Sequence, residues 1–465
     1  MPDRRDVAVI GAGPGGYAAA IRLSQLGKRV CVIDVDEARL GGVCLNEGCI
    51  PVKSLINSAS VFSAIKKADV CGLEADVKNP DMKKITAVAK NTSTVLRNGL
   101  KSLFKKNGIE FIAGRAKLLP NKKIEIESKS GREEIEADNI IIATGSSPKV
   151  VPNIALDGKS IITSNEAVKL EILPKTMLVI GAGAIGVEFA SIFSSLGTEV
   201  AIMEMLPHLL PFKDDEISKT LERIFKKRGI EVFTGAKVKA LSKKGKSAEA
   251  VFETDTGEKK AGFEIVLVAA GRKPNTEGLG LKEAGVKIKD GFITADDRMR
   301  TNVKNIYAVG DVLNTPMYAH VAYKEGIIAA EEIAGVKNEM IDYNNIPHVI
   351  FSEPQVAGVG LTELQAKENG YDVAVSKHFF KANSKAVISH SDEGFIKIIA
   401  DKKTRRLLGV YIIGEGATEI IHEFILAKSA GLTVDDIAKA VHAHPTLSEI
   451  AGDAAKAVFG KPIHG

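Results

Sequence analysis

The sequence predicts an α/β fold with two Rossmann-like dinucleotide-binding domains, followed by a C-terminal domain of the α+β type. A glycine-rich segment near the N-terminus recurs once, at a constant offset of 170 residues. Each copy lies between two short β-branched runs, which is the pattern of a βαβ unit. After about Asn345 the pattern changes to strand-like runs followed by helical stretches, which indicates a separate C-terminal domain.

The repeated segment carries three glycines in each copy. They are Gly11, Gly13 and Gly16 in the first copy and Gly181, Gly183 and Gly186 in the second. In a dinucleotide-binding turn the first glycine permits the tight turn, the second lets the backbone approach a pyrophosphate, and the third lets helix and strand pack closely. The N-terminus of the following helix offers free N–H groups to the phosphates. Structural glycine turns without a nucleotide are the alternative, and a single copy would be weak evidence.

An acidic residue ends the second strand of each copy, Asp34 in the first and Glu204 in the second. An acid at this distance accepts hydrogen bonds from a ribose diol. Two copies therefore predict two bound nucleotides. Glu204 would repel a 2′-phosphate, and no arginine follows it closely, so we expect the second site to prefer NAD(H) to NADP(H).

Length and composition narrow the class of protein. A chain of 465 residues needs several domains, and its 45% apolar and 26% charged residues are ordinary for a soluble globular protein. The net charge of +5, from 63 basic and 58 acidic residues, is scattered, so we expect no nucleic-acid partner. No uninterrupted apolar run reaches the ~20 residues of a membrane helix, so we expect no membrane partner. The first strand follows Met1–Arg5 directly, so we expect no signal peptide and a cytoplasmic location.

Two cysteines five residues apart, Cys44 and Cys49, form the most informative pair. In a regular helix their Cα atoms would lie about 8.7 Å apart, whereas a disulfide needs them within ~7 Å. A bridge therefore requires a distorted turn, and Gly48 gives freedom for one. A zinc site lacks further Cys or His ligands nearby, and a static disulfide is unusual in a reducing compartment. Two free packed thiols remain an alternative to redox function. Cys31 and Cys71 are predicted to be packing residues.

A histidine–carboxylate pair lies near the C-terminus, in the stretch His442-Ala-His444-Pro445-Thr446-Leu-Ser-Glu449. Thiol chemistry needs a base, and a neutral histidine oriented by a carboxylate suits that task. Glu449 could instead complete a helix-capping box with Thr446, or give one oxygen to each role. The residues alone do not choose between His442 and His444.

Taken together, these residues resemble the class I pyridine nucleotide–disulfide oxidoreductases, and among them most closely the dihydrolipoamide dehydrogenases. The most specific stretches are GGVCLNEGCIPVK (41–53), GAGAIGVEFA (181–190), YAVGDV (307–312) and HAHPTLSE (442–449). The resemblance covers nearly the whole chain. It implies an FAD domain with the redox disulfide (1–149), an NAD domain (150–275), a central domain that completes the FAD site (276–345) and a dimerisation domain (346–465).

The resemblance also implies the cofactor contacts, and no metal. For FAD it implies Gly11, Gly13, Gly16, Asp34, Gly42, Lys53, Ala116, Thr144, Gly145, Ser146, Asp311, Met317, Ala319 and His320. For NAD it implies Gly181, Gly183, Gly186, Glu188, Glu204, Val238 and Gly271. Asp311 would bond the ribityl chain of the flavin, and Lys53 with Glu188 matches an ion pair beside it.

The implied reaction is the oxidation of dihydrolipoamide with reduction of NAD⁺. His444, with Glu449 as its partner, would deprotonate a substrate thiol at the disulfide of the other subunit of a homodimer. The thiolate would attack Cys44 and expel Cys49, which lies nearer the flavin. The implied partners are the lipoyl domains and acyltransferase core of a 2-oxoacid dehydrogenase complex, or a lipoylated H protein.

Other members of this fold are the main alternatives. A glutathione-reductase type would carry a basic NADP site and HPTSSE in place of HPTLSE, and a non-catalytic FAD-bearing subunit would not need the intact cysteine pair. Three positions depart from the usual pattern without removing a group that the chemistry requires. Asp34 stands in place of a glutamate, Val52 in place of a small polar residue, and Glu47 lies between the cysteines.

Overall fold

The structure, a computed structural model, describes residues 5–464 apart from 77, 153, 212–213 and 256. The chain forms two compact units, and each gathers three separate segments of the sequence. The first unit comprises residues 1–54, 86–149 and 271–341, and the second comprises 55–85, 150–270 and 342–465. The predicted limits of four consecutive domains stay a prediction.

The first unit is built on a seven-stranded sheet of order β3-β2-β1-β6-β5-β4, with β19 pairing β6. Its strands are β1 (Arg5–Ile10), β2 (Val30–Asp34), β3 (Glu110–Ala113), β4 (Arg115–Leu118), β5 (Lys123–Ser128), β6 (Gly131–Ile142) and β19 (Ile306–Ala308). β3, β2, β1, β6 and β19 run parallel, whereas β4, β5 and β6 form an antiparallel meander. The β-branched runs predicted on either side of the first glycine turn are confirmed as strands β1 and β2.

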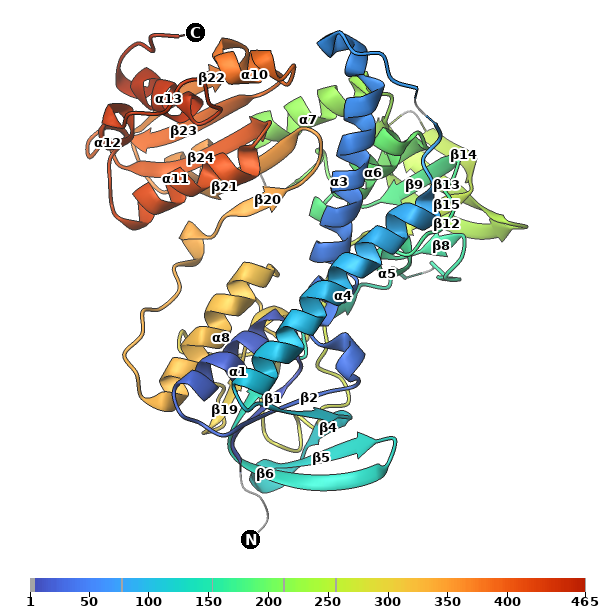
Figure 1. Ribbon diagram of the computed structural model, residues 1–465, viewed down its shortest axis with the longest axis vertical. Coiled ribbons are helices and arrows are strands. Elements are labelled where there is room, and N and C mark those ends of the chain that lie inside the picture. The colour runs from blue at the N-terminus through green and yellow to red at the C-terminus, as the bar shows by residue number, and fades with distance from the viewer. Residues whose placement is uncertain (1–4, 77, 153, 212–213, 256, 465) are drawn as a thin grey trace. The chain divides into compact units, whose positions relative to one another are not determined.

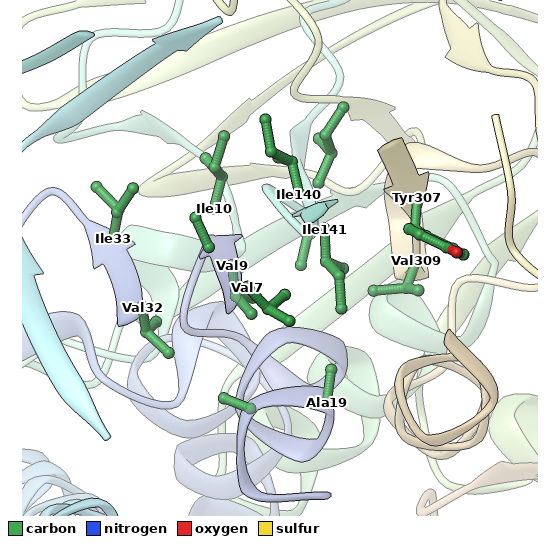
Figure 2. Packing of buried hydrophobic residues seen from close by; sticks show 14 of the residues in the cluster. Val7, Val9, Ile10, Ala19, Val32, Ile33, Ile140, Ile141, Tyr307 and Val309 are labelled. Atoms are coloured by element: carbon green, nitrogen blue, oxygen red, sulfur yellow. The ribbon is translucent and has the colours of Figure 1, made fainter. Parts of the chain in front are cut away.

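The core of this sheet has apolar side chains on both faces. Val7 and Val9 point toward helix α1 (Pro14–Gln25), and Ile10 points to the opposite face (Figure 2). All three are at most 4% exposed. Two-sided burial is typical of parallel strands covered by other elements on each face, and it explains why these strands read as continuous apolar runs.

Helices α1 and α8 (Ala319–Ala334) lie side by side on this unit (Figure 1). α1 starts with Pro14 at its first position, where the missing N–H costs no hydrogen bond. Three further helices carry the cysteine loop and its support: α2 (Gly42–Asn46), α3 (Cys49–Lys66) and α4 (Met82–Lys106). The unit boundary falls within α3 and α4.

The second unit repeats the βαβ arrangement in a parallel sheet of order β11-β10-β9-β15-β8. Its strands are β8 (Ile161–Ile162), β9 (Thr176–Ile180), β10 (Glu199–Met203), β11 (Glu231–Phe233) and β15 (Ile265–Val268). Its helices are α5 (Ser164–Ala167), α6 (Ala184–Leu196) and α7 (Asp215–Lys227), and an antiparallel sheet joins β12 (Lys237–Lys244), β13 (Ser247–Thr254) and β14 (Gly257–Phe263). The predicted internal repeat is therefore a repeat of structure.

The second unit also contains the predicted C-terminal α+β part, an antiparallel sheet of order β20-β21-β24-β23-β22. Its strands are β20 (His348–Ile350), β21 (Gln355–Gly360), β22 (Val373–Phe379), β23 (Phe395–Asp401) and β24 (Leu407–Gly414). Its helices are α9 (Glu363–Glu368), α10 (Ser384–Ile388), α11 (Ala417–Ser429), α12 (Val434–Lys439) and α13 (Glu449–Phe459). β23 and β24 are buried along their whole length, with α11 and α13 packed on the sheet.

One stretch, residues 42–66, has the length and the mean hydropathy of 1.2 that a membrane-crossing helix needs, and 22% of its tested window is buried. This is weak evidence, because the core helix of a soluble protein meets the same criteria. In the structure the stretch is two helices, α2 and α3, separated by Glu47 and Gly48. The expectation of no membrane partner stays a prediction.

Candidate active site

The two cysteines lie at a break between helices. Cys44 lies in α2, which ends at Asn46, and Cys49 begins α3. Glu47 leaves the helical conformation at φ −141°. A Cβ at Gly48 would lie 3.0 Å from the Val43 carbonyl oxygen and 3.3 Å from the Cys44 Cα. The predicted distortion is present, and glycine is required here for space rather than for a left-handed backbone.

The structure has no disulfide between Cys44 and Cys49, so the predicted bridge stays a prediction. The pKa of the Cys44 thiol is raised far above its ordinary value, first by its hydrogen bond with Cys49, then by burial and by negative charge on Cys49. The charge of Lys53 acts in the opposite direction. The pair therefore favours one negative charge over two, which suits a dithiol whose two sulfurs have different tasks.

The loop that carries Cys44 is held by the side chain of Asn46. Its amide nitrogen donates to the carbonyl oxygens of Gly42 at 2.8 Å, Leu40 at 3.1 Å and Arg39 at 3.2 Å. Its side-chain oxygen accepts a 2.8 Å hydrogen bond from Arg97 of α4. Asn46 and Arg97 thus fix α2 at its start, although neither was predicted as a site residue.

Two tyrosines lie within electrostatic range of the cysteine pair. Tyr17 of α1 and Tyr323 of α8 hydrogen-bond through their hydroxyls at 2.7 Å. The pKa of Tyr17 is raised mainly by burial, with a smaller contribution from charge on Cys44 and Cys49. Both hydroxyls therefore stay protonated in the physiological range and add dipoles, not charge, to the surroundings of the cysteines.

The first glycine turn has the shape that a dinucleotide pyrophosphate needs. A Cβ at Gly11 would lie 2.2 Å from the Ala143 carbonyl oxygen, and one at Gly16 would lie 1.9 Å from the Gly11 carbonyl oxygen. Gly13 caps α1 without a side-chain hydrogen bond, so the free N–H groups of the helix remain available to an anion. A Cβ at Gly42 would lie 2.6 Å from the Gly13 Cα, so this turn adjoins the start of α2. These residues fit FAD.

The acids at the ends of β2 and β10 bond their own glycine turns in the same way. Asp34 accepts from the Ala12 N–H at 2.8 Å, and Glu204 accepts from the Ala182 N–H at 2.8 Å. The shorter arm of Asp34 therefore reaches the position that the glutamate of the second copy reaches. Burial is the main cause that raises the pKa of Asp34.

Asp311 belongs to a partly buried polar cluster in the first unit. Ser146 donates to Asp311 at 2.5 Å, and Arg272 donates to the Ser146 hydroxyl at 2.7 Å and lies 3.8 Å from Asp311. The Gly310 N–H donates to the fully buried Glu325 at 2.6 Å. This cluster holds the predicted ribityl-binding carboxylate, and sequence reasoning did not select Arg272 or Glu325.

Six other predicted FAD contacts lie on three segments of the first unit. Thr144 donates to the Asn275 carbonyl oxygen at 2.7 Å, and Gly145 follows it with φ +70°. Ala116 lies on β4. Met317 precedes α8, and Ala319 is the first residue of this helix. The His320 ring stacks on the Tyr318 ring, with 5.1 Å between the ring centroids. Asn275 follows Gly271 in a turn and could have indicated this contact with Thr144, but sequence reasoning did not select it.

The second glycine turn has the same construction as the first. A Cβ at Gly181 would lie 2.5 Å from the Ala269 carbonyl oxygen, one at Gly186 would lie 1.9 Å from the Gly181 carbonyl oxygen, and space is open at Gly183. Gly183 caps α6 without a side-chain hydrogen bond. Glu204 also accepts from the Leu206 N–H at 2.9 Å. The turn fits a second dinucleotide.

Three further predicted NAD contacts lie on separate segments. Glu188 is buried on α6 and accepts from the Phe351 N–H at 3.0 Å. Val238 lies on β12 of the second unit. Gly271 has φ +105° and belongs to the first unit. Their contact with NAD stays a prediction.

His444 and Glu449 are brought together at the start of α13. The Nδ1 atom of His444 lies 2.9 Å from Glu449 Oε1, and the Thr446 N–H donates to Glu449 Oε2 at 2.8 Å. The hydrogen bond from Thr446 is the main cause that lowers the pKa of Glu449, with a further contribution from His444. One carboxylate oxygen thus makes each of the two contacts, and the His444 side chain is 69% exposed.

Two predictions need correction. The capping box is only half formed, because α13 begins at Glu449 with Ser448 as its N-cap and the Thr446 hydroxyl donates to the Ala443 carbonyl oxygen. Cys31 is buried as predicted, and its pKa rises to about 12 through burial. Cys71 is exposed, however, because it ends a short 3-10 turn and not a buried strand.

Comparisons with known proteins agree with this site. Residues 5–326 match the family described as pyridine nucleotide-disulphide oxidoreductase, and residues 346–455 match its dimerisation domain. The chain belongs to the pyridine nucleotide-disulphide oxidoreductase family. As a member of this family it is an enzyme, its cofactors are FAD and NAD, and its dimerisation domain makes it a homodimer.

Relatives of this oxidoreductase match over their full length. Dihydrolipoyl dehydrogenase of Zymomonas mobilis is 41% identical over 100% of both chains, and that of Thermus scotoductus is 41% identical over 99% of this chain and 98% of its own. Among solved structures, LpdA from Mycobacterium tuberculosis has a TM-score of 0.90 at 27% identity, covering 97% of this chain and 99% of its own. The HOCl-induced flavoprotein disulfide reductase RclA from Escherichia coli, as a Cu(II) complex, has a TM-score of 0.89 at 27% identity, covering 98% and 99%.

Proposed function

We propose that this oxidoreductase oxidises dihydrolipoyl groups to lipoyl groups and reduces NAD⁺ to NADH, through the Cys44–Cys49 pair and FAD. The observation that carries the proposal is the cysteine pair at a helix break that adjoins the first dinucleotide turn. The full-length similarity to curated dihydrolipoyl dehydrogenases supports the substrate.

His444 is the base in this proposal. Its Nδ1–H donates to Glu449, which leaves Nε2 as the nitrogen that takes a proton from a substrate thiol. Its exposed side chain supports a role toward the cysteine pair of the other subunit, because it can face a neighbouring chain. Glu449 holds the ring and stabilises the imidazolium that forms.

The covalent steps balance as two thiol–disulfide exchanges. The first substrate thiolate attacks Cys44 Sγ, the Cys44–Cys49 bond breaks, and Cys49 leaves as a thiolate. The second substrate thiol, once deprotonated, attacks the mixed disulfide and expels Cys44, which takes the proton back. Two electrons thereby pass from the substrate to the cysteine pair, while one proton ends on Cys44 and the other on His444, so that Cys49 stays a thiolate. When bound, FAD supplies the two-electron relay from this dithiol to NAD⁺.

The remaining residues orient the cofactors. Lys53, whose charge reaches Cys44, would favour negative charge on the dithiol. Glu204 would bond the ribose hydroxyls of NAD⁺ and disfavour a 2′-phosphate. Asp311, in its cluster with Ser146 and Arg272, would bond the ribityl chain.

The wider setting is part of the proposal. The substrate would be carried on the lipoyl domains of a 2-oxoacid dehydrogenase complex, with its acyltransferase core as a partner, or on a lipoylated H protein. The enzyme would act in the cytoplasm. The dimerisation match to residues 346–455 supports the homodimer that such a base in trans requires.

Steady-state turnover tests the proposal. The purified homodimer, loaded with FAD, is assayed with NAD⁺ and free dihydrolipoamide, and in parallel with NADPH and glutathione disulfide. We expect the first pair to exceed the second by at least about 100-fold in kcat/KM, because Glu204 disfavours the 2′-phosphate of NADPH. Greater activity with the second pair would overturn the assignment.

A further inference from the structure

A second histidine–carboxylate pair lies beside the proposed base. His442 Nε2 lies 3.0 Å from Glu423 Oε1 and 3.3 Å from Oε2. Glu423 is on α11, so this contact ties the loop between α12 and α13 to a different helix. The side chain of His442 is only 13% exposed, against 69% for His444. Two residues apart, the first histidine faces the protein and the second faces outward.

The ring of His442 also contacts the backbone of α13. A Cβ added at Gly452 would lie 3.0 Å from His442 Nδ1 and 3.1 Å from Cε1. Glycine at this buried position of α13 therefore leaves the room that the imidazole fills. Gly452 lies one helical turn beyond Glu449, so the His442 ring spans from α11 to the helix that carries the partner of the base.

This placement argues against His442 as a second base. One ring nitrogen is engaged by Glu423, and the other faces the α13 backbone at Gly452. A base must reach the proton that it takes, and neither nitrogen is directed outward. The loop is tied at a further point, where Asn383 donates to the Thr446 carbonyl oxygen at 3.0 Å.

We infer that His442 and Glu423 are positioning residues for His444: they brace the 440–448 loop so that the base meets Glu449 in the orientation that proton transfer needs. This inference rests on the proposed function, because it assigns a task only if His444 acts as the base. It predicts that loosening the brace slows thiol deprotonation while leaving the cofactor sites as they are.

Four variants separate the brace from a general effect on folding. His442→Ala removes the ring, and His442→Gln keeps a side-chain N–H able to donate to Glu423. Gly452→Ala places a methyl group against the ring without changing any polar side chain. His422→Gln is the matched control, since His422 precedes Glu423 on α11 and is exposed.

The readout compares two activities of the FAD-loaded homodimer. Oxidation of dihydrolipoamide by NAD⁺ needs the base, whereas reduction of ferricyanide by NADH does not. We expect His442→Ala and Gly452→Ala to lose about 10- to 100-fold in kcat with dihydrolipoamide and to keep ferricyanide reduction. His442→Gln should recover to within about threefold of the wild type, and His422→Gln should match it.

The outcomes are distinguishable from failure of the proposed function. If the wild type itself does not oxidise dihydrolipoamide, the proposed function fails. If the wild type is active and His442→Ala and Gly452→Ala equal it, the brace is wrong. Equal loss in both activities would also overturn the brace, because it would mean that the loop only supports the fold.

Discussion

Glu449 divides its carboxylate between His444 and the backbone that leads into α13. One oxygen lies 2.9 Å from His444 Nδ1, and the other accepts from the Thr446 N–H at 2.8 Å. The same side chain therefore fixes the imidazole and the chain segment that carries it. A glutamate held at both oxygens keeps a fixed orientation toward the ring.

Replacement of Glu449 by glutamine should lower turnover with dihydrolipoamide. Because its pKa is lowered in the folded protein, Glu449 stays ionised from neutral pH to below the ordinary ~4.3 of a glutamate. Glu449→Gln keeps the size but removes the charge that stabilises the imidazolium, so we expect at least about a tenfold loss of kcat with dihydrolipoamide. Ferricyanide reduction by NADH is the control and should not change. An unchanged kcat would contradict the role of Glu449.

Gly48 should tolerate no side chain. Gly48→Ala would push a methyl group against the Val43 carbonyl and the Cys44 Cα, and we expect destabilisation by about 1–3 kcal/mol together with slower closure of the cysteine bridge. Urea unfolding and thiol titration after air oxidation measure the two effects. Gly99→Ala in α4 is the control, because space is open there, and it should stabilise by up to about 1 kcal/mol.

We expect Arg97 to affect turnover through its hydrogen bond to Asn46, and not through its charge alone. Without Arg97, the side-chain oxygen of Asn46 loses its 2.8 Å partner and α2 is less firmly held, so Arg97→Ala should lower turnover about three- to tenfold and shift the midpoint potential of the cysteine pair. Lys101→Ala removes a neighbouring ion pair on α4, 2.8 Å from Glu37, and should leave both quantities unchanged. Equal behaviour of the two variants would contradict this role.

The sequence was sufficient to predict the doubled βαβ unit, because the glycine turn, the strands and the terminal acid are all local in the chain. It was also sufficient to predict the two contacts of Glu449, since both partners lie within five residues of it. It did not reveal the contact of Arg97 with Asn46, because the two residues are 51 positions apart and α4 shows only an ordinary polar face there. The prediction that Cys71 is a packing residue was wrong, because an apolar neighbour in sequence does not show whether a turn is buried.

The choice between His442 and His444, which the residues alone leave open, shows the same limit. The two histidines are close in sequence, but only His442 contacts Glu423 on another helix and lies against Gly452. Such contacts depend on tertiary packing, which composition and periodicity do not encode.

The ion pairs of the buried Lys397 should make the free energy of unfolding depend on pH in the acidic range. Lys397 of β23 lies 3.1 Å from the buried Asp214, 2.9 Å from Glu216 and 3.0 Å from Glu363. Burial would raise the pKa of Glu216, but the hydrogen bonds and charge of Lys397 and Lys377 lower it, and hydrogen bonds from Lys367 and Lys397 lower that of Glu363. A lowered carboxyl pKa gives stability that is complete above the unfolded value of ~4.3 and is lost as the pH falls through the folded value.

Lys397→Met tests this dependence. It leaves Asp214 buried without its cation, so we expect a loss of about 3–5 kcal/mol at pH 7 and a smaller further loss on acidification to pH 4 than in the wild type. Urea unfolding at both pH values measures this. Lys402→Met, which breaks the exposed 2.7 Å pair with Asp372, is the control and should change little. A parallel decline of Lys397→Met and the wild type with acid would contradict the assignment.

The central claim is that Cys44 faces the substrate and Cys49 faces the flavin. The most direct measurement is the visible spectrum of Cys44→Ser and Cys49→Ser, each purified with FAD and assayed for dihydrolipoamide turnover. We predict a long-wavelength thiolate–flavin band in Cys44→Ser, no such band in Cys49→Ser, and no dihydrolipoamide turnover in either. A band that persists in Cys49→Ser, or turnover that survives either substitution, would contradict the account.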